Sequence, residues 1–219
     1  MNDYYSKDDI VVGIDEAGLG PLVGPVYIAG VILPLHCPFP EKEYQKMWND
    51  INDSKKMKKV RRLELFEFIK KVAIDYSIVA VDNETIDRIN PRNARLNGFH
   101  QVIDNLRVRP DMILVDGDCF NPYIDKQSED GDMVPHECVV KGDSKYKCIA
   151  AASILAKVSH DLYLEELSKE FDDCYNWTKN QGYGTECHTN AIKLFGITKY
   201  HRKTYGICKE WKTLPRIFI

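Results

Sequence analysis

Hydrophobic residues in this chain occur as short runs that alternate with longer segments of helical spacing. A short apolar run bounded by turn residues is typical of a strand. Such runs predict strands at residues 11–15, 26–33, 74–81 and 112–115, and in a run that ends at Lys141. A turn rich in glycine and proline joins the first two, so we expect them to be neighbours in one sheet.

Apolar residues recur every three or four positions between these strands, which predicts helices. In the first helix, capped by Asp53 or Ser54, the apolar positions run from Met57 through Val60 to Ile69. The polar segment 119–135 is predicted to be a long loop that points into solvent. Strands that alternate with helices indicate an α/β fold. The remaining helices are predicted at residues 84–90, 93–106, 146–171 and 185–196.

Composition excludes several classes of protein. A chain of 219 residues can bury a sizeable core, and its charged fraction of 29% is ordinary for a soluble globular protein. No apolar stretch is long enough to span a bilayer and residues 1–9 are polar, so we expect no membrane helix and no signal peptide. The seven cysteines include no C-x-x-C pair, which predicts free thiols in a reducing compartment, the cytoplasm.

The distribution of charge leaves two interpretations open. A formal net charge of −3 gives no reason by itself to expect a nucleic-acid partner. Basic residues nevertheless cluster at 55–62, at 141–157 and at 199–203. Such clusters are either solvated helix faces or contacts for a phosphate backbone.

Carboxylates follow three of the predicted strands, each beside a glycine. Asp15 and Glu16 precede the Gly18 turn, Asp116 precedes Gly117, and Asp143 follows Gly142. In α/β proteins the ends of strands carry functional groups. Carboxylates that converge there would repel one another, and Mg²⁺ prefers oxygen ligands, so the pattern predicts a metal-dependent phosphate site. Surface exposure of the acidic pair and a helix cap at Asp143 are the alternatives.

The sequence motifs around these carboxylates resemble the signatures of ribonuclease HII, the type 2 ribonuclease H family. The matching segments are DEAGLGPLVGPV at 15–26, DSKKM at 53–57, KGDS with IAAASILAKV at 141–158, GYGT with His188 at 182–188, and HRKTY at 201–205. They occur in the order of the family and span most of the chain.

This resemblance implies a ribonuclease H-like fold, a mixed five-stranded sheet flanked by helices. It divides the chain into a catalytic domain at 10–175 and a small helical extension at 176–219. It also implies a monomer that cuts the RNA strand of RNA–DNA hybrids and cuts 5′ of ribonucleotides embedded in duplex DNA, leaving 3′-hydroxyl and 5′-phosphate ends. Two Mg²⁺ or Mn²⁺ ions would be held by four carboxylates: Asp15, Glu16, Asp116 and Asp143.

The same resemblance assigns the substrate contacts. The turn formed by Gly18, Leu19 and Gly20 would sense the ribose 2′-hydroxyl, and Tyr183 would pack on the neighbouring sugar. Leu19 departs from the family, which has arginine there, so this chain lacks one charged phosphate contact and should bind the strand less tightly. The expected phosphate contacts are Lys55, Lys56, Lys141 and Arg202.

Other residues near these motifs are expected to lie outside the site. Asp118 is placed outside it, Asp161 behind it or on the surface, and Ser153 in the packing of the long helix.

Three alternatives remain open from the sequence. A non-catalytic hybrid-binding protein would share the fold, but binding alone gains nothing from a repulsive acidic cluster. A type 3 ribonuclease H shares the acidic pair but usually carries an additional N-terminal domain, and only about ten residues precede the first strand here. The C-terminal tail, with Leu214, Ile217 and Phe218, either packs on its own domain or docks on a sliding clamp.

Overall fold

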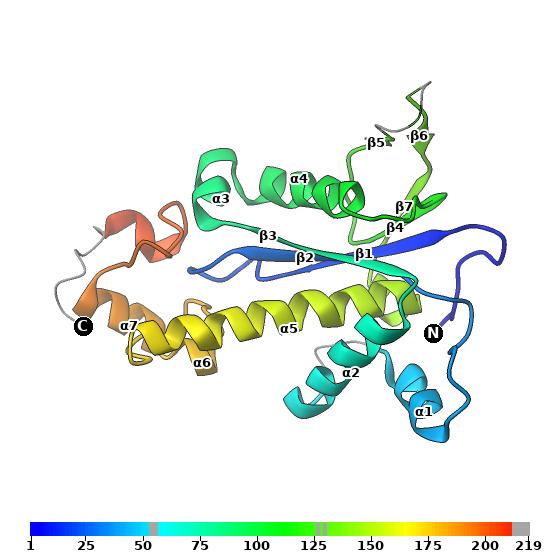
Figure 1. The fold of residues 1–219 in the computed structure, drawn as a ribbon. Helices are drawn as coiled ribbons and strands as arrows, with labels where there is room; N and C mark the ends of the chain where they lie inside the picture. The colour runs from blue at the N-terminus through cyan, green and yellow to red at the C-terminus, as the bar shows by residue number, and fades with distance from the viewer. Residues whose placement is uncertain (53–56, 126–127, 129–130, 212–219) are drawn as a thin grey trace.

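The computed structural model describes residues 1–52, 57–125, 128 and 131–211, and a five-stranded mixed sheet lies at its centre (Figure 1). β1 pairs antiparallel with β2 and parallel with β4, which confirms the predicted mixed sheet. β2 pairs antiparallel with β3, and β4 pairs parallel with β7. In spatial order the strands are β3 (Asp75–Val81), β2 (Val26–Ile32), β1 (Val11–Ala17), β4 (Met112–Asp116) and β7 (His136–Val139).

Helices cover both faces of this sheet (Figure 1). On one face lie α3 (Asn83–Ile89) and α4 (Pro91–Asp104), and on the other lie α1 (Lys42–Asp50), α2 (Lys59–Val72) and α5 (Lys147–Glu170). The extension carries α6 (Trp177–Asn180), α7 (Glu186–Phe195) and the 3₁₀ turn η3 (Gly206–Glu210) at one end of α5. Within the described residues, no helix combines the length and apolar character needed to cross a bilayer.

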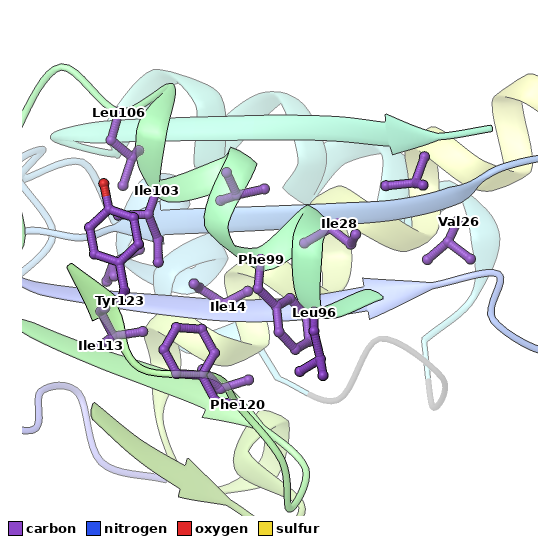
Figure 2. Close-up of a cluster of buried hydrophobic side chains, with 14 of the residues drawn as sticks. Ile14, Val26, Ile28, Leu96, Phe99, Ile103, Leu106, Ile113, Phe120 and Tyr123 are labelled. Atoms are coloured by element: carbon purple, nitrogen blue, oxygen red, sulfur yellow. The ribbon is translucent and has the colours of Figure 1, made fainter. Parts of the chain in front are cut away.

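The core on the α4 face is built from alternate positions of the strands (Figure 2). Ile14 and Ile28 point from β1 and β2 toward Phe99 and Ile103 of α4, and all four are fully buried. Because strand side chains alternate in direction, Asp15 must point to the opposite face, toward α5. The position of this carboxylate is therefore fixed by the hydrophobic pattern of its own strand.

The α5 face of the sheet is packed unusually closely at one point. A Cβ at Gly13 would lie 2.4 Å from the backbone of Cys148 and Ile149, so only glycine allows α5 to lie directly on β1. Small buried residues of α5, Ala150–Ala152 among them, continue this contact. As a result, the residues of α5 that follow lie beside the end of β1, where the acidic pair is found.

The predicted bounds of α5 and α7 are confirmed, and those of α2 are not. α2 begins at Lys59, and the expected caps, Asp53 and Ser54, lie outside the described residues. Val60, predicted on the apolar face, is 70% exposed, whereas Leu65 and Phe68 are buried. The predicted face was right at Ile69, which is completely buried, and wrong at Val60, because α2 packs between α1, which was not predicted, and α5.

The segment 119–135 is only partly the solvent loop that was predicted. Phe120, Tyr123 and Val134 are buried in the core on the α4 face. The Tyr123 hydroxyl donates a hydrogen bond to Asp104 at 2.9 Å, and a short hairpin, β5 (Tyr123–Ile124) and β6 (Met133–Val134), stands out from the sheet (Figure 1). Aromatic residues inside a polar segment were the sign that its ends are anchored.

A buried cluster joins the C-terminal segment to α5 and to the turn after β1, and two buried histidines pack against its aromatic rings. His188 and His201 are completely buried, and desolvation lowers the pKa of His188 below its ordinary value and that of His201 to about 3. Both imidazoles are therefore neutral in the folded protein near neutral pH.

These histidines predict a loss of stability in acid. Each takes up a proton more readily in the unfolded chain, so the free energy of unfolding is highest above pH 6.5 and falls as the pH drops from 6.5 toward 3. The limiting slope from His201 is about 1.4 kcal/mol per pH unit, and His188 adds to it in the same direction. Urea unfolding between pH 7 and pH 5 measures it.

A His201→Asn variant should show a shallower pH dependence than the parent, and His36→Asn, at an exposed position, should not. The raised pKa of Asp15 has the opposite effect, because it makes the free energy of unfolding rise as the pH falls. This contribution is the same in the parent, His201→Asn and His36→Asn, so it cancels in the comparison. Equal slopes in the parent and His201→Asn would contradict the prediction.

Candidate active site

Two of the predicted carboxylates lie at the same level on neighbouring strands. β1 and β4 are parallel, with Ile14 opposite Val115, so the next residues, Asp15 and Asp116, are side by side. Adjacent strands are about 4.8 Å apart. The two side chains therefore belong to one site at the end of the sheet.

Asp15 is the most strongly perturbed of these groups. Its carboxyl is 4% exposed, and burial, followed by repulsion from Glu16 and Asp116, raises its pKa well above the ordinary value. Hydrogen bonds from Ser153 and from the Glu16 backbone N–H act in the opposite direction. Repulsion between buried carboxylates is relieved either by a proton or by a cation.

Glu16 points away from Asp15, because the strand continues through it to Ala17. Its carboxylate lies 3.3 Å from the Arg95 guanidinium of α4, and both side chains are mostly buried. Arg95 was not predicted from the sequence, where the available sign was an arginine among the apolar residues of a predicted helix. In the structure its guanidinium lies 5.6 Å from the centre of the Phe99 ring.

Asp116 and Asp143 are joined through a glycine. The Gly142 backbone N–H donates to Asp116 Oδ1 at 2.6 Å, and a Cβ on Gly142 would lie 2.6 Å from Ile149. Asp143 follows in a short 3₁₀ turn, η2 (Gly142–Ser144), and is 7% exposed. Lys141, in the left-handed conformation at φ 56°, is exposed beside them.

The oxygen atoms of the four carboxylates suit a hard divalent cation, although these side chains do not by themselves surround an ion. Asp15, Glu16, Asp116 and Asp143 supply only oxygen donors, which Mg²⁺ and Mn²⁺ prefer. In the part of the chain that the structure describes, no three acidic, histidine or cysteine side chains form a complete ligand group. Convergence of all four carboxylates stays a prediction: the structure places Asp15 and Asp116 side by side, while Arg95 holds Glu16 on the other face of the sheet. A magnesium site normally takes one or two carboxylates, with water and phosphate as the other ligands, so the residues fit such an ion.

A cleft of about 450 Å³ extends from Glu16 along the turn that follows β1. It is lined by that turn, by residues of α2 and α5 and by the start of the extension. Five of the residues predicted from the sequence line it: Glu16, Gly18, Leu19, Gly20 and Tyr183.

The turn itself depends on glycine at two positions. Gly18 has φ +86°, and a Cβ there would lie 2.4 Å from His160 of α5. A Cβ at Gly20 would lie 3.1 Å from the ring of Tyr183, whose side chain is 47% exposed. The structure thus brings Tyr183 against the turn with which it was predicted to act.

Arg202 does not make the phosphate contact that was predicted. It is completely buried, and its guanidinium donates to the carbonyl oxygens of Gly18 at 2.6 Å, Leu19 at 2.8 Å and Gly24 at 3.0 Å. The sequence showed a basic cluster, and the structure shows that this one residue supports the turn from behind.

The side of the cleft formed by α5 carries an ion-pair group. Asp161 forms ion pairs with Lys157 at 2.8 Å and with Arg62 at 3.1 Å. Burial alone would raise its pKa, but its contacts with His160 and Lys157 outweigh that effect and leave the pKa lowered. Lys157 also donates to Gln181. Asp161 is therefore a mostly buried residue behind Arg62 and Lys157, which line the cleft, and this agrees with one of the two positions expected for it.

Four further positions were singled out in the sequence, and the structure describes two of them. Asp118 is exposed, as expected for a residue outside the site. Ser153 is buried as predicted, but it lines the cleft and also donates to Asp15. Lys55 and Lys56 lie outside the described residues.

Comparison with known proteins identifies this arrangement. The family model described as Ribonuclease HII matches residues 12–212, which include all four carboxylates, the turn and Tyr183. The chain belongs to the ribonuclease HII family. A Ribonuclease HII of Christiangramia forsetii is 43% identical over 210 residues, covering 96% of this chain and 97% of the relative. A Ribonuclease HII of Parabacteroides distasonis is 42% identical over 211 residues, covering 96% and 97%.

Solved structures confirm the predicted ribonuclease H-like fold. The ribonuclease H2 of Pyrococcus horikoshii OT3 superposes with a TM-score of 0.71 at 25% identity, covering 91% of this chain and 95% of that one. A structure of the PCNA:RNase HII complex from Archaeoglobus fulgidus matches with a TM-score of 0.68 at 28% identity, covering 90% and 96%.

Family membership sets aside two of the three alternatives. A ribonuclease HII is a nuclease, a hydrolase with ribonuclease H endonuclease activity on nucleic acid, so the chain is not a binding module alone. The match to ribonuclease HII over nearly the whole chain also disfavours a type 3 enzyme; a Bst-RNase HIII shares the fold at 18% identity and a TM-score of 0.59.

Proposed function

We propose that this ribonuclease HII hydrolyses the RNA strand of RNA–DNA hybrids and also cuts 5′ of single ribonucleotides embedded in duplex DNA. The products carry 3′-hydroxyl and 5′-phosphate ends. The observation that supports this proposal most is the cleft, because it joins the acidic strand end at Glu16 to the Gly18–Gly20 turn and Tyr183. A strand lying in it presents a phosphate to the carboxylates and the adjacent sugar to the turn.

The four carboxylates, Asp15, Glu16, Asp116 and Asp143, would hold two Mg²⁺ or Mn²⁺ ions. Two such ions activate water and stabilise the leaving oxygen of a phosphodiester. Asp15 must give up its proton for this role, and its raised pKa makes cation binding favour high pH. Arg95 orients Glu16, and the Gly142 N–H orients Asp116. Lys141 lies exposed beside Asp143, where its ammonium reaches a phosphate.

Ribose sensing is assigned to the backbone of the turn. A 2′-hydroxyl both donates and accepts, so it is best recognised by main-chain groups held in one geometry. Arg202 takes the carbonyl oxygens of Gly18 and Leu19, which fixes that geometry. The exposed ring of Tyr183, seated against Gly20, then offers an apolar surface to the neighbouring sugar.

Substitution of Tyr183 tests this assignment. Tyr183→Ala should slow cleavage at a single embedded ribonucleotide by about tenfold or more, because stacking contacts of a base or sugar on an aromatic ring contribute roughly 1–3 kcal/mol. Digestion of a long hybrid should fall less, since it does not depend on one junction. Tyr183→Phe keeps the ring and should retain the preference. Equal losses on both substrates in Tyr183→Ala would show that Tyr183 does not read the junction.

Leu19→Arg tests the departure from the family. The added guanidinium should tighten binding to both substrates, by at most roughly 1.5–3 kcal/mol for a charge-assisted contact and less where solvent screens it. The gain should shrink as salt rises, because phosphate contacts release counterions. Leu19 packs partly against the core on the α4 face, so Leu19→Met, which keeps that packing, is the control. A shifted cut site in Leu19→Arg would show that residue 19 takes part in sensing the sugar.

Localisation and oligomeric state are also proposals. We propose that the protein acts in the cytoplasm and as a monomer, and light scattering with and without a hybrid duplex measures its oligomeric state. The sliding-clamp alternative involves the tail at 212–219, which lies outside the described residues.

A further inference from the structure

We infer that His188 and His201 form a buried hydrogen-bond relay that positions Tyr183 against the turn, which makes both histidines positioning residues for single-ribonucleotide cleavage. This inference rests on the proposed role of Tyr183. Neither histidine lines the cleft, and neither contacts the acidic strand end. Their effect on the substrate would pass entirely through the backbone of residue 183.

Fixed donors determine which nitrogen of His188 carries the proton. The Trp177 indole N–H, which can only donate, lies 3.0 Å from His188 Nε2, so that nitrogen is an acceptor. In the neutral ring the proton is then on Nδ1, which lies 2.9 Å from the carbonyl oxygen of Tyr183. His188 therefore donates to the backbone of Tyr183.

The second histidine fixes the first. The backbone N–H of Thr198 donates to His201 Nδ1 at 2.9 Å, which places the His201 proton on Nε2. That nitrogen lies 3.2 Å from His188 Nε2 and donates to it, sharing the single lone pair of His188 Nε2 with the Trp177 indole N–H. The chain of hydrogen bonds thus runs in one direction, from Thr198 through His201 and His188 to Tyr183.

Burial keeps this relay in a single state. Both imidazoles are completely buried, Trp177 is 1% exposed, and the Tyr175 ring lies 5.2 Å from that of His201. Desolvation lowers the pKa of both histidines, so each ring stays neutral and keeps one donor and one acceptor nitrogen.

The relay ends at the backbone of Tyr183, whose ring is half-exposed. The Tyr183 carbonyl accepts from His188 and, at 2.8 Å, from the Thr185 N–H, and the Tyr183 N–H donates to the Asn180 carbonyl at 3.0 Å. The preceding Gly182 has φ +77° and bonds the turn through its carbonyl and the Leu22 N–H at 2.8 Å. With both ends of its peptide fixed, the half-exposed ring is held against Gly20.

Two substitutions of His188 separate positioning from packing. The amide nitrogen of asparagine reaches the place of Nδ1, whereas the amide of glutamine reaches the place of Nε2. His188→Asn therefore keeps the donor to Tyr183 and loses the contacts to Trp177 and His201. His188→Gln keeps an acceptor for those two residues and loses the donor to Tyr183.

The relay predicts that His188→Gln loses more activity than His188→Asn, whereas His188→Asn loses more stability. In His188→Gln, kcat/KM on a duplex with one ribonucleotide should fall about tenfold, the factor of one neutral hydrogen bond, while a long hybrid is cut within about twofold of the parent. His188→Asn should keep the parent's preference although its melting temperature falls further, because it leaves a larger void and an unpaired indole N–H. A role in packing alone predicts that His188→Asn is worse in both respects, and that result would overturn the inference.

A measurement without substrate separates this inference from the proposed function. The Tyr183 ring faces Gly20, so its ring current should shift the Gly20 α-proton resonances, and Tyr183→Ala gives the unshifted reference. The shift should persist in His188→Asn and move to the reference in His188→Gln. The same shift in both His188 variants would overturn the relay even if Tyr183→Ala loses the substrate preference. Loss of the shift in His188→Gln, with no selective loss in Tyr183→Ala, would support the relay and reject the proposed role of Tyr183.

Discussion

Replacing Asp15 or Asp116 with asparagine should abolish divalent-metal-dependent cleavage while the fold survives. Each ion contributes several kcal/mol of charge stabilisation, so the loss should be at least about a thousandfold in rate. Asparagine keeps a carbonyl oxygen for the Glu16 N–H in one case and for the Gly142 N–H in the other. Cleavage of a labelled RNA–DNA hybrid over a range of Mg²⁺ and Mn²⁺ concentrations measures the effect.

The stability of these variants provides a second test. Burial and then repulsion from Glu16 and Asp116 raise the pKa of Asp15. In the metal-free protein, removal of one charge from the cluster relieves the repulsion, so the free energy of unfolding should be unchanged or slightly higher. Asp118→Asn is the matched control, since this exposed carboxylate lies two positions from Asp116. It should leave both cleavage and stability as in the parent. Full activity in Asp15→Asn or Asp116→Asn would remove the two-metal assignment.

Substitution of Arg202 should have the largest effect on stability. Arg202→Ala removes a buried guanidinium and leaves three carbonyl oxygens without their donor. We expect a loss on the order of 3–5 kcal/mol, because hydrogen bonds to charged groups are worth about 1.5–3 kcal/mol each and unpaired buried groups add a penalty. Cleavage of both substrates should fall with it, since the Gly18–Gly20 turn loses its support. Urea unfolding and parallel kinetics measure the two effects.

The original phosphate-contact prediction makes a different forecast for the same variant. A lost surface contact would leave stability nearly unchanged and reduce the salt dependence of binding. Arg202→Lys gives an intermediate case, because an ammonium cannot reach three carbonyls as a planar fork does. Lys203→Ala, at the exposed neighbouring position, is the control and should leave stability unchanged. A stable Arg202→Ala with a weaker salt dependence would restore the phosphate contact.

The strand ends and the two best-bounded helices followed from local rules. The run before Asp15 is a strand because apolar residues there are too few for a helix and are followed by glycine. Thr185 and Gly196 mark the ends of α7 because a hydroxyl caps its first turn and a positive φ, at 76°, ends it. Where the bounds of an element are set by residues adjacent in the chain, the sequence is sufficient to predict them. The missed α1 and the exposed Val60 of α2 show the limit, since α2 packs on α5, which is distant in the chain.

The sequence by itself determined the family, because the motifs lie in order along the chain. It also predicted the four carboxylates and the Gly18–Gly20 turn, because both are read from residue order at strand ends. Only the tertiary structure decided what surrounds them. Glu16 meets Arg95 across 79 positions, and the Gly18 carbonyl meets Arg202 across 184. A basic residue looks the same in a sequence whether it faces a phosphate or is buried under a turn. That choice depends on which segments exclude water from it, and only the folded chain fixes those contacts.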